Sequence, residues 1–523
     1  TNFKNGYKKS DRVAPEHEAW LEADQMELFQ ILRDEKDRRA AEKALNETVH
    51  SQPIYYGDNR ISQQKLSPDQ RFVTYRLTST TGFKGTNMPK YITESGYTED
   101  QRARQKVGTP QDSYETYVYD TQRDTSYLIR VNDLPGILEK PAFYWEYADE
   151  DSEYEPAFIR ERETIIHGPY YAPNGQRAVV IVRSMDNKDR WLAELNLSTG
   201  QLTTFDRQHD DAWIGGPGIS GWNFQSGTIG WLDDHRVYFQ SESTGFSHLY
   251  VHNFKTKTTS ALTNGKYEIL DVKLSKDKRT FYLHANAAGP HDQHFYRLSV
   301  DGGRMERLTN RSGKHEVTLS PDERQLAILY SSSNQPTELY LMPNKTGGKM
   351  TQLTRSTTNA FKAYPWRQPE IVWFPARDGI YVPARLYRPK RGKAVGPGVI
   401  FVHGAGYLQN VHNWWSTYYR EYMFHNFLAD QGYTVLDIDY RGSAGYGRDW
   451  RTAIYRHMGG KDLEDQIDGA KYMVDSLGLS PERLGIYGGS YGGFITLMAL
   501  FKNPGVFQAG AALRSVTDWA HYN

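Results

Sequence analysis

The sequence predicts two domains of different class, an all-β domain built from repeated hairpins and an α/β domain with a mostly parallel sheet. A turn-Arg-strand unit recurs between about residues 50 and 360, and fully apolar strands alternate with amphipathic stretches after Pro365. The 523 residues are enough for two or more hydrophobic cores. We expect an N-terminal helical segment over 1–50, the repeat domain over 51–360 and the α/β domain over 361–523.

The N-terminal segment is rich in charged residues. Residues 15–47 contain strong helix formers, no Gly, and Pro only at the first position. The residues Leu21, Leu28, Ile31 and Leu32 offer one apolar helical face. We predict one long helix that packs on the body through this face, and a partner-binding helix is the alternative.

The repeat domain shows two recurring patterns. A polar turn, then Arg, then an apolar strand occurs at 66–77, 171–182, 231–240, 274–284 and 319–330. Two strands ending in Leu-Thr occur at 249–263, 295–309 and 339–354. The Leu-Thr ends recur after 46 and 45 residues, a period typical of a four-stranded propeller blade. We therefore predict a β-propeller of about seven blades, within a range of six to eight, with insertions at 80–112 and 132–170. Two unrelated all-β domains, the alternative, would not share one unit at one spacing.

The α/β domain contains apolar strands that end in glycines. "GPGVIFVHGAG" (396–406) and "GYTVLDIDYRGSAGYG" (432–447) are two such strands, and 379–389 is predicted as a strand pair. The amphipathic stretch 462–478 is predicted as a helix. Apolar strands alternating with helices indicate a parallel sheet covered on both faces, with function at the carboxyl ends of its strands.

Ser490 is the candidate nucleophile of this domain. It stands in "GIYGGSYGGF", between a strand at 484–487 and a helix expected from Phe494. A serine on such a strained strand-to-helix turn has an exposed hydroxyl, and small neighbours are needed because the backbone doubles back. The start of the following helix offers N–H groups to a developing oxyanion, so the Tyr491 N–H is predicted as one donor.

The second oxyanion donor is expected from the glycine-rich loop at 401–406, at the Ala405 N–H. His403 precedes the nucleophile, whereas this fold orders its triad as Ser, acid and His, so we interpret His403 as a residue that shapes the loop. The alternative is a catalytic base. Asp439 and Arg441 are interpreted as a structural pair.

Asp462 and Asp465 lie near the start of a predicted helix. The helix dipole favours carboxylates at that end without any catalytic purpose. We therefore assign neither residue to the chemistry.

In this order, repeated hairpins, "YRGSAGYG", "GGKDLEDQIDGAKYMV" and "GIYGGSYGGF" resemble the prolyl oligopeptidase family of serine peptidases from about residue 50 onward. The resemblance implies a β-propeller followed by an α/β-hydrolase domain, which is incomplete in this chain. "SVTDWAHYN" (515–523) is similar to the stretch that lines the proline pocket in the dipeptidyl peptidase IV branch. It implies a pocket wall of Tyr491, Val516, Trp519 and Tyr522.

Two positions depart from that branch. His403 stands where the branch has a tyrosine, and the chain lacks the adjacent glutamates that hold a substrate's amino terminus. The acidic run 146–155 is a candidate substitute for those glutamates, and a solvated loop is the alternative.

The acid and histidine of the triad are expected after Asn523, because Ser490 lies only 33 residues from the end and His521 is too near the strand-to-helix turn of Ser490. We therefore expect the remainder of the polypeptide, either as a second chain after cleavage or as residues outside this sequence.

Composition restricts the partners. Lys plus Arg and Asp plus Glu number 63 each, which gives no overall field for nucleic acid or a membrane surface. Cys is absent, which excludes thiolate chemistry, and we expect neither a metal nor a cofactor. The sequence does not decide whether the protein forms a homo-oligomer. Because the first residue is Thr rather than Met, we favour a periplasmic or secreted location over a cytoplasmic one.

The sequence thus predicts a serine peptidase that cleaves short peptides after Pro or a small residue through an acyl-enzyme at Ser490. One alternative is an esterase or other acyl hydrolase on the same fold. Another is a non-enzymatic propeller module with an incomplete triad. An Asp and a His after residue 523 would separate the enzymes from the binding module.

Overall fold

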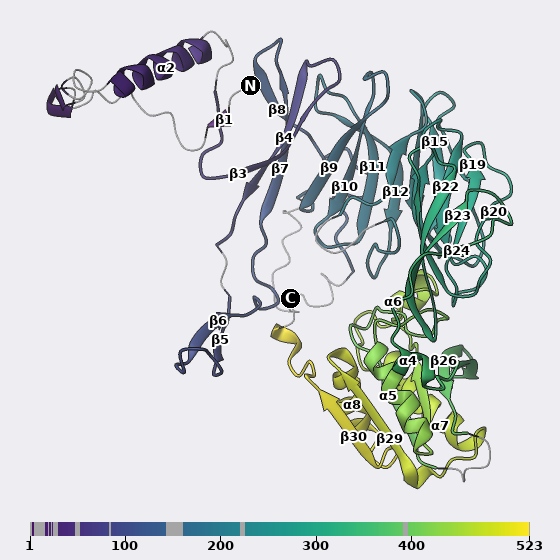
Figure 1. Ribbon diagram of the computed structural model, residues 1–523. Coiled ribbons are helices and arrows are strands. Elements are labelled where there is room, and N and C mark those ends of the chain that lie inside the picture. The colour runs from purple at the N-terminus through teal and green to yellow at the C-terminus, as the bar shows by residue number, and fades with distance from the viewer. Residues whose placement is uncertain are drawn as a thin grey trace.

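The computed structural model describes residues 3–4, 16–18, 20–21, 24, 30–47, 53–82, 85–142, 160–219, 225–390 and 396–521. Repeated antiparallel sheets stand side by side above an α/β domain (Figure 1). The N-terminal helix α2 (Gln30–Glu47) covers the later part of the helix predicted over 15–47, and the described residues before it, 16–18, 20–21 and 24, are also helical. Of the predicted apolar face, Leu21 is exposed, and the side chains of Leu28, Ile31 and Leu32 lie outside the described residues, so the packing of this face stays a prediction. A two-residue strand, β1 (Phe3–Lys4), pairs in parallel with β2 (Ile54–Tyr55).

Five four-stranded antiparallel sheets form the propeller in the described residues. Their strands are β3 (Arg60–Leu66), β4 (Phe72–Ser79), β7 (Ser113–Asp120) and β8 (Thr125–Leu128); β9 (Thr164–Tyr171), β10 (Ala178–Ser184), β11 (Asp189–Leu195) and β12 (Leu202–His209); β13 (Ile229–Trp231), β14 (Arg236–Ser241), β15 (His248–Asn253) and β16 (Thr258–Ala261); β17 (Ile269–Leu274), β18 (Thr280–Ala285), β19 (His294–Ser299) and β20 (Glu306–Arg307); and β21 (Lys314–Leu319), β22 (Gln325–Ser332), β23 (Gln335–Pro343) and β24 (Thr351–Gln352).

The described residues form five blade sheets, fewer than the predicted count of about seven. The hairpin of β5 (Asn87–Lys90) and β6 (Glu99–Arg102) is inserted between β4 and β7. A further 35 residues separate β8 from β9. Dividing the whole length by one period assigned these insertions to blades.

The recurring unit is a turn closed by side chains. In three blades a Ser hydroxyl donates to the Asp two residues later and accepts from the first N–H of the following strand. The three Ser–Asp pairs are Ser67–Asp69, Ser275–Asp277 and Ser320–Asp322, at 2.5, 2.6 and 2.6 Å. The residue after each Asp has a φ near +60°, at Gln70, Lys278 and Glu323. Local hydrogen bonds of this kind stabilise the turn before each strand, which explains why the unit repeats in the sequence.

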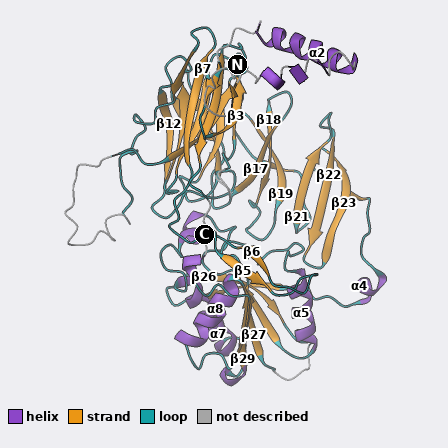
Figure 2. Cartoon of the chain, turned by 90° about the vertical axis from the view of Figure 1, so that its left-hand side faces the viewer, coloured by secondary structure: helices purple, strands orange, loops and turns teal. Residues whose placement is uncertain are grey.

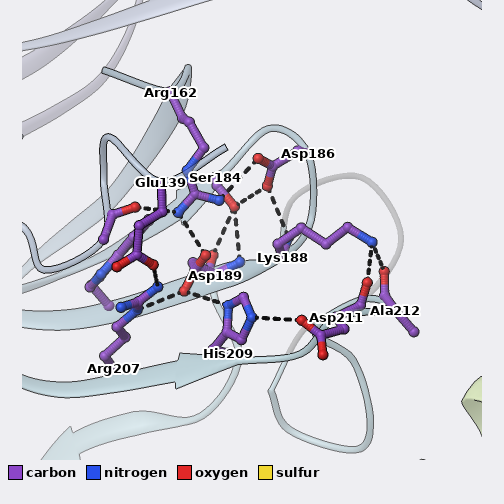
Figure 3. Close-up of polar contacts among 12 residues, drawn as sticks. Glu139, Arg162, Ser184, Asp186, Lys188, Asp189, Arg207, His209, Asp211 and Ala212 are labelled. Atoms are coloured by element: carbon purple, nitrogen blue, oxygen red, sulfur yellow. Dashed lines mark hydrogen bonds and ion pairs between the residues drawn. The ribbon is translucent and has the colours of Figure 1, made fainter. Parts of the chain in front are cut away.

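A buried ionic cluster stabilises the second sheet on the side facing the α/β domain (Figure 3). The fully buried carboxylate of Asp189 accepts from Arg162 at 2.6 Å, Arg207 at 2.8 Å and the His209 ring at 3.0 Å. Burial alone would raise the pKa of Asp189, but the Arg207 and Arg162 hydrogen bonds outweigh burial and lower it. Next to Asp189, Lys188 donates at 2.7 Å to the Tyr455 hydroxyl of the α/β domain. The cluster therefore also anchors the contact between the two domains.

The α/β domain has one six-stranded sheet in the order β25-β26-β28-β27-β29-β30. The last four strands in this order run parallel to one another. β26 pairs antiparallel with both β28 and β25. Figure 2 shows helices packed around this sheet, below the propeller. The elements are α4 (Asn359–Ala363), β25 (Glu370–Pro375), β26 (Tyr381–Tyr387), β27 (Gly398–Val402), α5 (Tyr419–Asp430), β28 (Thr434–Ile438), α6 (Arg448–Thr452), α7 (Lys461–Asp475), the 3-10 turn Pro481–Arg483, β29 (Leu484–Gly489), α8 (Tyr491–Lys502), β30 (Ala509–Leu513) and the 3-10 turn Trp519–His521.

The strand pair predicted within 379–389 is wrong. These residues form the single strand β26, whose hairpin partner is β25. The buried strands β27, β28 and β29 agree with the predicted apolar runs, and their side chains form the main core with those of α7 and α8. The predicted boundary at 360 lies between β24, the last blade strand, and β25. No helix in the described residues is both long and apolar enough to span a bilayer.

Polar contacts join the propeller to the α/β domain. Arg451 of α6 forms a bidentate pair with Glu242 at 2.7 and 2.6 Å, and both side chains are nearly buried. Asn286 donates to the Gly445 carbonyl at 3.1 Å. These contacts surround a cavity of about 1030 Å³ between the two domains.

Candidate active site

Ser490 occupies a strained turn between β29 and α8. Its φ of 58° and ψ of −118° place a non-glycine residue in a region that costs on the order of 1–3 kcal/mol. The Ser490 N–H donates to the Leu513 carbonyl at 2.9 Å, and the Ser490 carbonyl accepts from Phe494 at 3.1 Å. The surrounding backbone therefore fixes the turn, as a nucleophile elbow requires.

The helix after Ser490 begins at Tyr491, three residues earlier than predicted. Gly492 makes this early start sterically allowed, since a Cβ there would lie 2.0 Å from the Val402 carbonyl oxygen. Tyr491 is the first residue of α8, so its N–H belongs to the first helical turn, which has no intrahelical acceptor. This N–H is available at the position assigned to an oxyanion donor.

The loop after β27 packs directly on the elbow. A Cβ at Gly404 would lie 3.6 Å from the Ser490 Cβ, and a Cβ at Gly406 would lie 3.3 Å from the Tyr491 ring. Ala405, between these glycines, has a φ of 61° and donates its N–H to no described residue. The structure thus brings Ala405, Tyr491 and Ser490 together, as the predicted oxyanion site needs.

His403 is fully buried on the far side of this loop. Its Nε2 lies 2.9 Å from the Ser443 hydroxyl, and its ring stacks on Tyr440. Burial lowers the pKa of His403, which keeps the ring neutral. These contacts support the interpretation of His403 as a loop-shaping residue.

The Tyr491 side chain points into the protein. Its hydroxyl donates to Asp462 at 2.5 Å, and Asp462 also accepts from the Gly459 and Leu463 N–H groups. Burial raises the pKa of Tyr491, and the neighbouring Asp462 raises it further. Asp462 therefore holds the ring of a predicted site residue, a role that the dipole argument missed.

The predicted pair of Asp439 and Arg441 is wrong. Asp439 accepts from the Asn410 and Val411 N–H groups at 2.8 and 3.0 Å. Arg441 pairs instead with Asp465 at 2.5 Å. Both residues follow β28, but each is bound by a different distant element.

Two of the predicted pocket residues lie beside the elbow. The Val516 N–H donates to the Ser490 carbonyl at 3.4 Å. Trp519 is half-buried and packs edge-to-face against Tyr491 and Phe494, with ring centroids 5.7 and 5.2 Å away. Tyr522 and the acidic run 146–155 lie outside the described residues. Val516 and Trp519 thus lie beside the elbow, and Trp519 packs on the buried ring of Tyr491.

No imidazole or carboxylate of the described residues hydrogen-bonds the Ser490 hydroxyl. His521 is exposed and binds Asp518 at 2.8 Å, in a local pair three residues apart. The expectation that the base and acid lie elsewhere therefore stays a prediction.

The cavity between the domains extends from the propeller to the oxyanion loop, where Tyr407 lines it. Glu268 lines the cavity from the propeller. The residue is 3% exposed, and its side chain makes no hydrogen bond to the described residues. Burial raises the pKa of Glu268 to about 7, with a smaller contribution from Glu242. Sequence reasoning missed Glu268 because one acidic residue before a strand carries no motif.

Comparison with known proteins agrees with this geometry. The family described as "Prolyl oligopeptidase family" matches residues 420–523, and "Dipeptidyl peptidase IV (DPP IV) N-terminal region" matches residues 62–337. Human dipeptidyl peptidase 8 is 29% identical over 324 residues, covering 54% of this chain and 36% of the relative. The uncharacterized peptidase YuxL of Bacillus subtilis is 29% identical over 252 residues, covering 48% of this chain and 36% of the relative.

Solved structures share the fold. Porphyromonas gingivalis dipeptidyl peptidase 4 superposes with a TM-score of 0.68 at 20% identity, covering 88% of this chain and 60% of that one. The chain thus spans about a third of these two curated relatives and three fifths of this structure. Since the dipeptidyl peptidase IV N-terminal region alone matches more than half of the chain, the chain belongs to the prolyl oligopeptidase family, in its dipeptidyl peptidase IV-like branch.

Proposed function

We propose that this protein is a serine peptidase that forms an acyl-enzyme at Ser490. The observation that carries the proposal is the strained turn at Ser490, packed against the loop of Gly404, Ala405 and Gly406. Membership in a peptidase family and relatives named as dipeptidyl peptidases favour a peptide over a small ester.

We propose the following roles for the groups around Ser490. The Ser490 Oγ attacks the scissile carbonyl carbon while its proton passes to a general base, and the carbonyl oxygen becomes an oxyanion. The Tyr491 and Ala405 N–H groups donate to that oxyanion. The base returns its proton to the departing amine as the intermediate collapses to an ester at Ser490, and water then hydrolyses this ester to free Ser490 and the acid product.

The chamber restricts the substrate to short peptides. Its volume of about 1030 Å³ holds a few residues, and residues of the propeller and of the α/β domain line it. A folded protein does not fit such a volume, so we propose peptides with a free end as substrates. This argument also disfavours the esterase alternative, because a small ester needs no chamber of that size.

The residue before the scissile bond is proposed to be Pro or another small apolar residue. Trp519 and Tyr491 form an apolar wall, and a charged side chain buried there without a partner costs several kcal/mol. We expect Trp519→Ala to lower kcat/KM for a Pro substrate by roughly 1–3 kcal/mol of transition-state binding. Activity toward Phe should fall less.

The test is kcat/KM for chromogenic peptides with Pro, Ala, Phe, Lys and Asp at that position. Trp20→Ala is the control, since Trp20 is exposed in the N-terminal segment. A wild type that prefers Lys, or a Pro:Phe ratio that Trp519→Ala leaves unchanged, contradicts the pocket.

We further propose that Glu268 binds the free amino terminus of the peptide inside the chamber. Glu268 lines the cavity, and its carboxyl has no hydrogen-bond partner among the described residues, so an ammonium group can supply one. With a pKa of about 7, the carboxyl is neutral in acid and ionises as the pH rises through 7. The preference for a free over an acetylated amino terminus should therefore weaken as the pH falls below 7.

Glu268→Gln should reduce this preference about 10-fold at pH 7.5, which is the scale of one charged hydrogen bond. The preference should also lose its dependence on pH. The measurement is the ratio of kcat/KM for matched free and acetylated peptides between pH 5.5 and 7.5. Glu370→Gln, an exposed carboxylate on β25, is the control. An unchanged ratio in Glu268→Gln would remove Glu268 from the amino-terminal site.

A further inference from the structure

Tyr418 contacts the oxyanion loop at the point where the loop meets the elbow. The Gly404 N–H donates to the Tyr418 hydroxyl oxygen at 2.8 Å. A Cβ at Gly404 would lie 2.9 Å from that oxygen, 3.1 Å from the Gly489 carbonyl oxygen and 3.6 Å from the Ser490 Cβ. Only a residue without a side chain lets the hydroxyl, the loop and the nucleophile turn come this close.

Tyr418 is itself held on two sides. Its ring packs edge-to-face on Phe401, a fully buried residue of β27, with centroids 5.5 Å apart. Its N–H donates to the Ser416 hydroxyl at 2.9 Å, and its carbonyl accepts from Tyr422 at the start of α5. The hydroxyl is therefore fixed in position rather than free to move with a loop.

A chain of buried hydrogen bonds links this residue to the centre of the sheet. The Ser416 hydroxyl donates to the Asn410 side-chain oxygen at 2.5 Å, and the Asn410 side-chain nitrogen donates to Asp437 at 2.6 Å. Asp437 lies on β28 and is paired in register with Arg385 of β26. Ser416, Asn410 and Asp437 are each at most 3% exposed. This chain of buried hydrogen bonds ties the backbone of Tyr418 to the sheet and so limits the movement of its side chain.

The loop needs such support. Ala405 has a φ of 61°, which an alanine adopts at an energetic cost and keeps only when its surroundings determine it. The Tyr418 hydroxyl takes the Gly404 N–H, and this leaves the next N–H, that of Ala405, without an acceptor in the described part of the chain. The N–H that holds the loop and the N–H that is free to donate therefore belong to consecutive residues.

We propose that Tyr418 is a positioning residue for the oxyanion site, which holds the Gly404 N–H so that the Ala405 N–H points at the developing oxyanion. This inference rests on the proposed peptidase function. Tyr418 acts through Gly404 and Ala405 and has no contact with the reacting atoms, so its removal affects the transition state more than the bound substrate.

The experiment compares Tyr418→Phe with Tyr419→Phe in the full-length protein. Tyr419 is the neighbouring residue, is exposed and stacks on Trp415, so Tyr419→Phe removes a hydroxyl of the same kind outside the network. We expect Tyr418→Phe to lower kcat 10- to 100-fold, less than the loss of an oxyanion donor itself, with KM within about twofold of wild type. Tyr419→Phe should match wild type in both.

Inhibition separates positioning from a general structural role. A peptide aldehyde forms a tetrahedral adduct whose oxygen occupies the oxyanion site, whereas the product peptide does not use that site. In Tyr418→Phe we expect the Ki of the aldehyde to rise in parallel with the loss of kcat, while the Ki of the product stays within about twofold. Ser416→Ala, which keeps the tyrosine and breaks the link to Asn410, should show the same pattern at smaller size.

A double variant tests whether Tyr418 acts through Gly404. Gly404→Ala should lower kcat strongly because its methyl group meets the Tyr418 hydroxyl, and adding Tyr418→Phe should lower kcat no further. Losses that multiply in the double variant overturn the coupling.

Equal kcat in wild type and Tyr418→Phe, or equal loss of affinity for aldehyde and product, overturns the inference alone. A wild-type protein that neither cleaves peptides nor reacts with a fluorophosphonate overturns the proposed function, and the inference with it. Should Tyr418→Phe not fold, Ser416→Ala carries the same decision.

Discussion

Ser490→Ala is expected to abolish covalent labelling by a fluorophosphonate and to lower kcat by about 10⁴- to 10⁶-fold, the range found when a serine nucleophile is removed. The fold should persist, because the Ser490 hydroxyl makes no hydrogen bond to the described residues and alanine keeps the same Cβ on the same turn. The measurements are label incorporation, steady-state hydrolysis of a Pro-containing peptide and the circular dichroism spectrum. Residual activity above the uncatalysed rate should come from the two oxyanion N–H groups.

Ser476→Ala is the matched control, since Ser476 is an exposed serine at the end of α7 in the same domain. The control should keep full labelling. Undiminished labelling of Ser490→Ala would exclude Ser490 as the nucleophile, and lost labelling with a lost fold would instead point to a structural role for the hydroxyl.

The elbow could be predicted from the sequence because its causes are local. A short apolar strand, glycines around one serine and a following apolar run specify a tight strand-to-helix turn by themselves. The same holds for the loop at 401–406, where glycines directly follow a buried strand. The structure has both motifs where the sequence predicts them. Only the first turn of α8 was predicted to lie outside the helix, because glycine usually breaks helices.

The supporting residues could not be predicted, because each contacts a partner far along the chain. Asp462 binds Tyr491, which lies 29 residues later, and Tyr418 binds Gly404, which lies 14 residues earlier. Asp439 and Arg441 show the converse error: they are neighbours in sequence, yet each binds elsewhere. After a strand end, closeness in sequence does not decide which side chains pair. The elements that pack against that end decide it.

The number of blade sheets could not be predicted from the sequence period for a related reason. The turn closed by Ser and Asp identifies where a blade strand begins, so the recurring unit was a sound signal for the fold. The unit does not report how many residues lie between blades. The hairpin of β5 and β6 occupies chain length without adding to a blade sheet, and only the structure assigns it.

Gly492→Ala is expected to lower the free energy of unfolding by about 3 kcal/mol, the upper end of the usual cost of overpacking, and kcat/KM more than 100-fold. The physical reason differs from the strained turn that the sequence suggested, because the conformation of Gly492 is helical and the restriction is steric. The added Cβ would lie 2.0 Å from the Val402 carbonyl oxygen and 3.1 Å from that of His403.

These oxygens cannot yield independently of the site. Val402 ends β27, which is bonded on both edges to β28 and β29, and His403 begins the oxyanion loop. Relief of the contact must therefore move α8 away from the sheet or shift the loop, and either movement separates Ala405 from Ser490. Gly485→Ala, on β29 of the same unit, is the matched control, since a Cβ there would meet nothing closer than 3.5 Å. Urea unfolding and peptide hydrolysis of both variants check the prediction. Gly492→Ala should lose stability and activity together, while Gly485→Ala keeps both. A Gly492→Ala variant as stable and active as the control would show that α8 does not pack against β27 as closely as the structure has it.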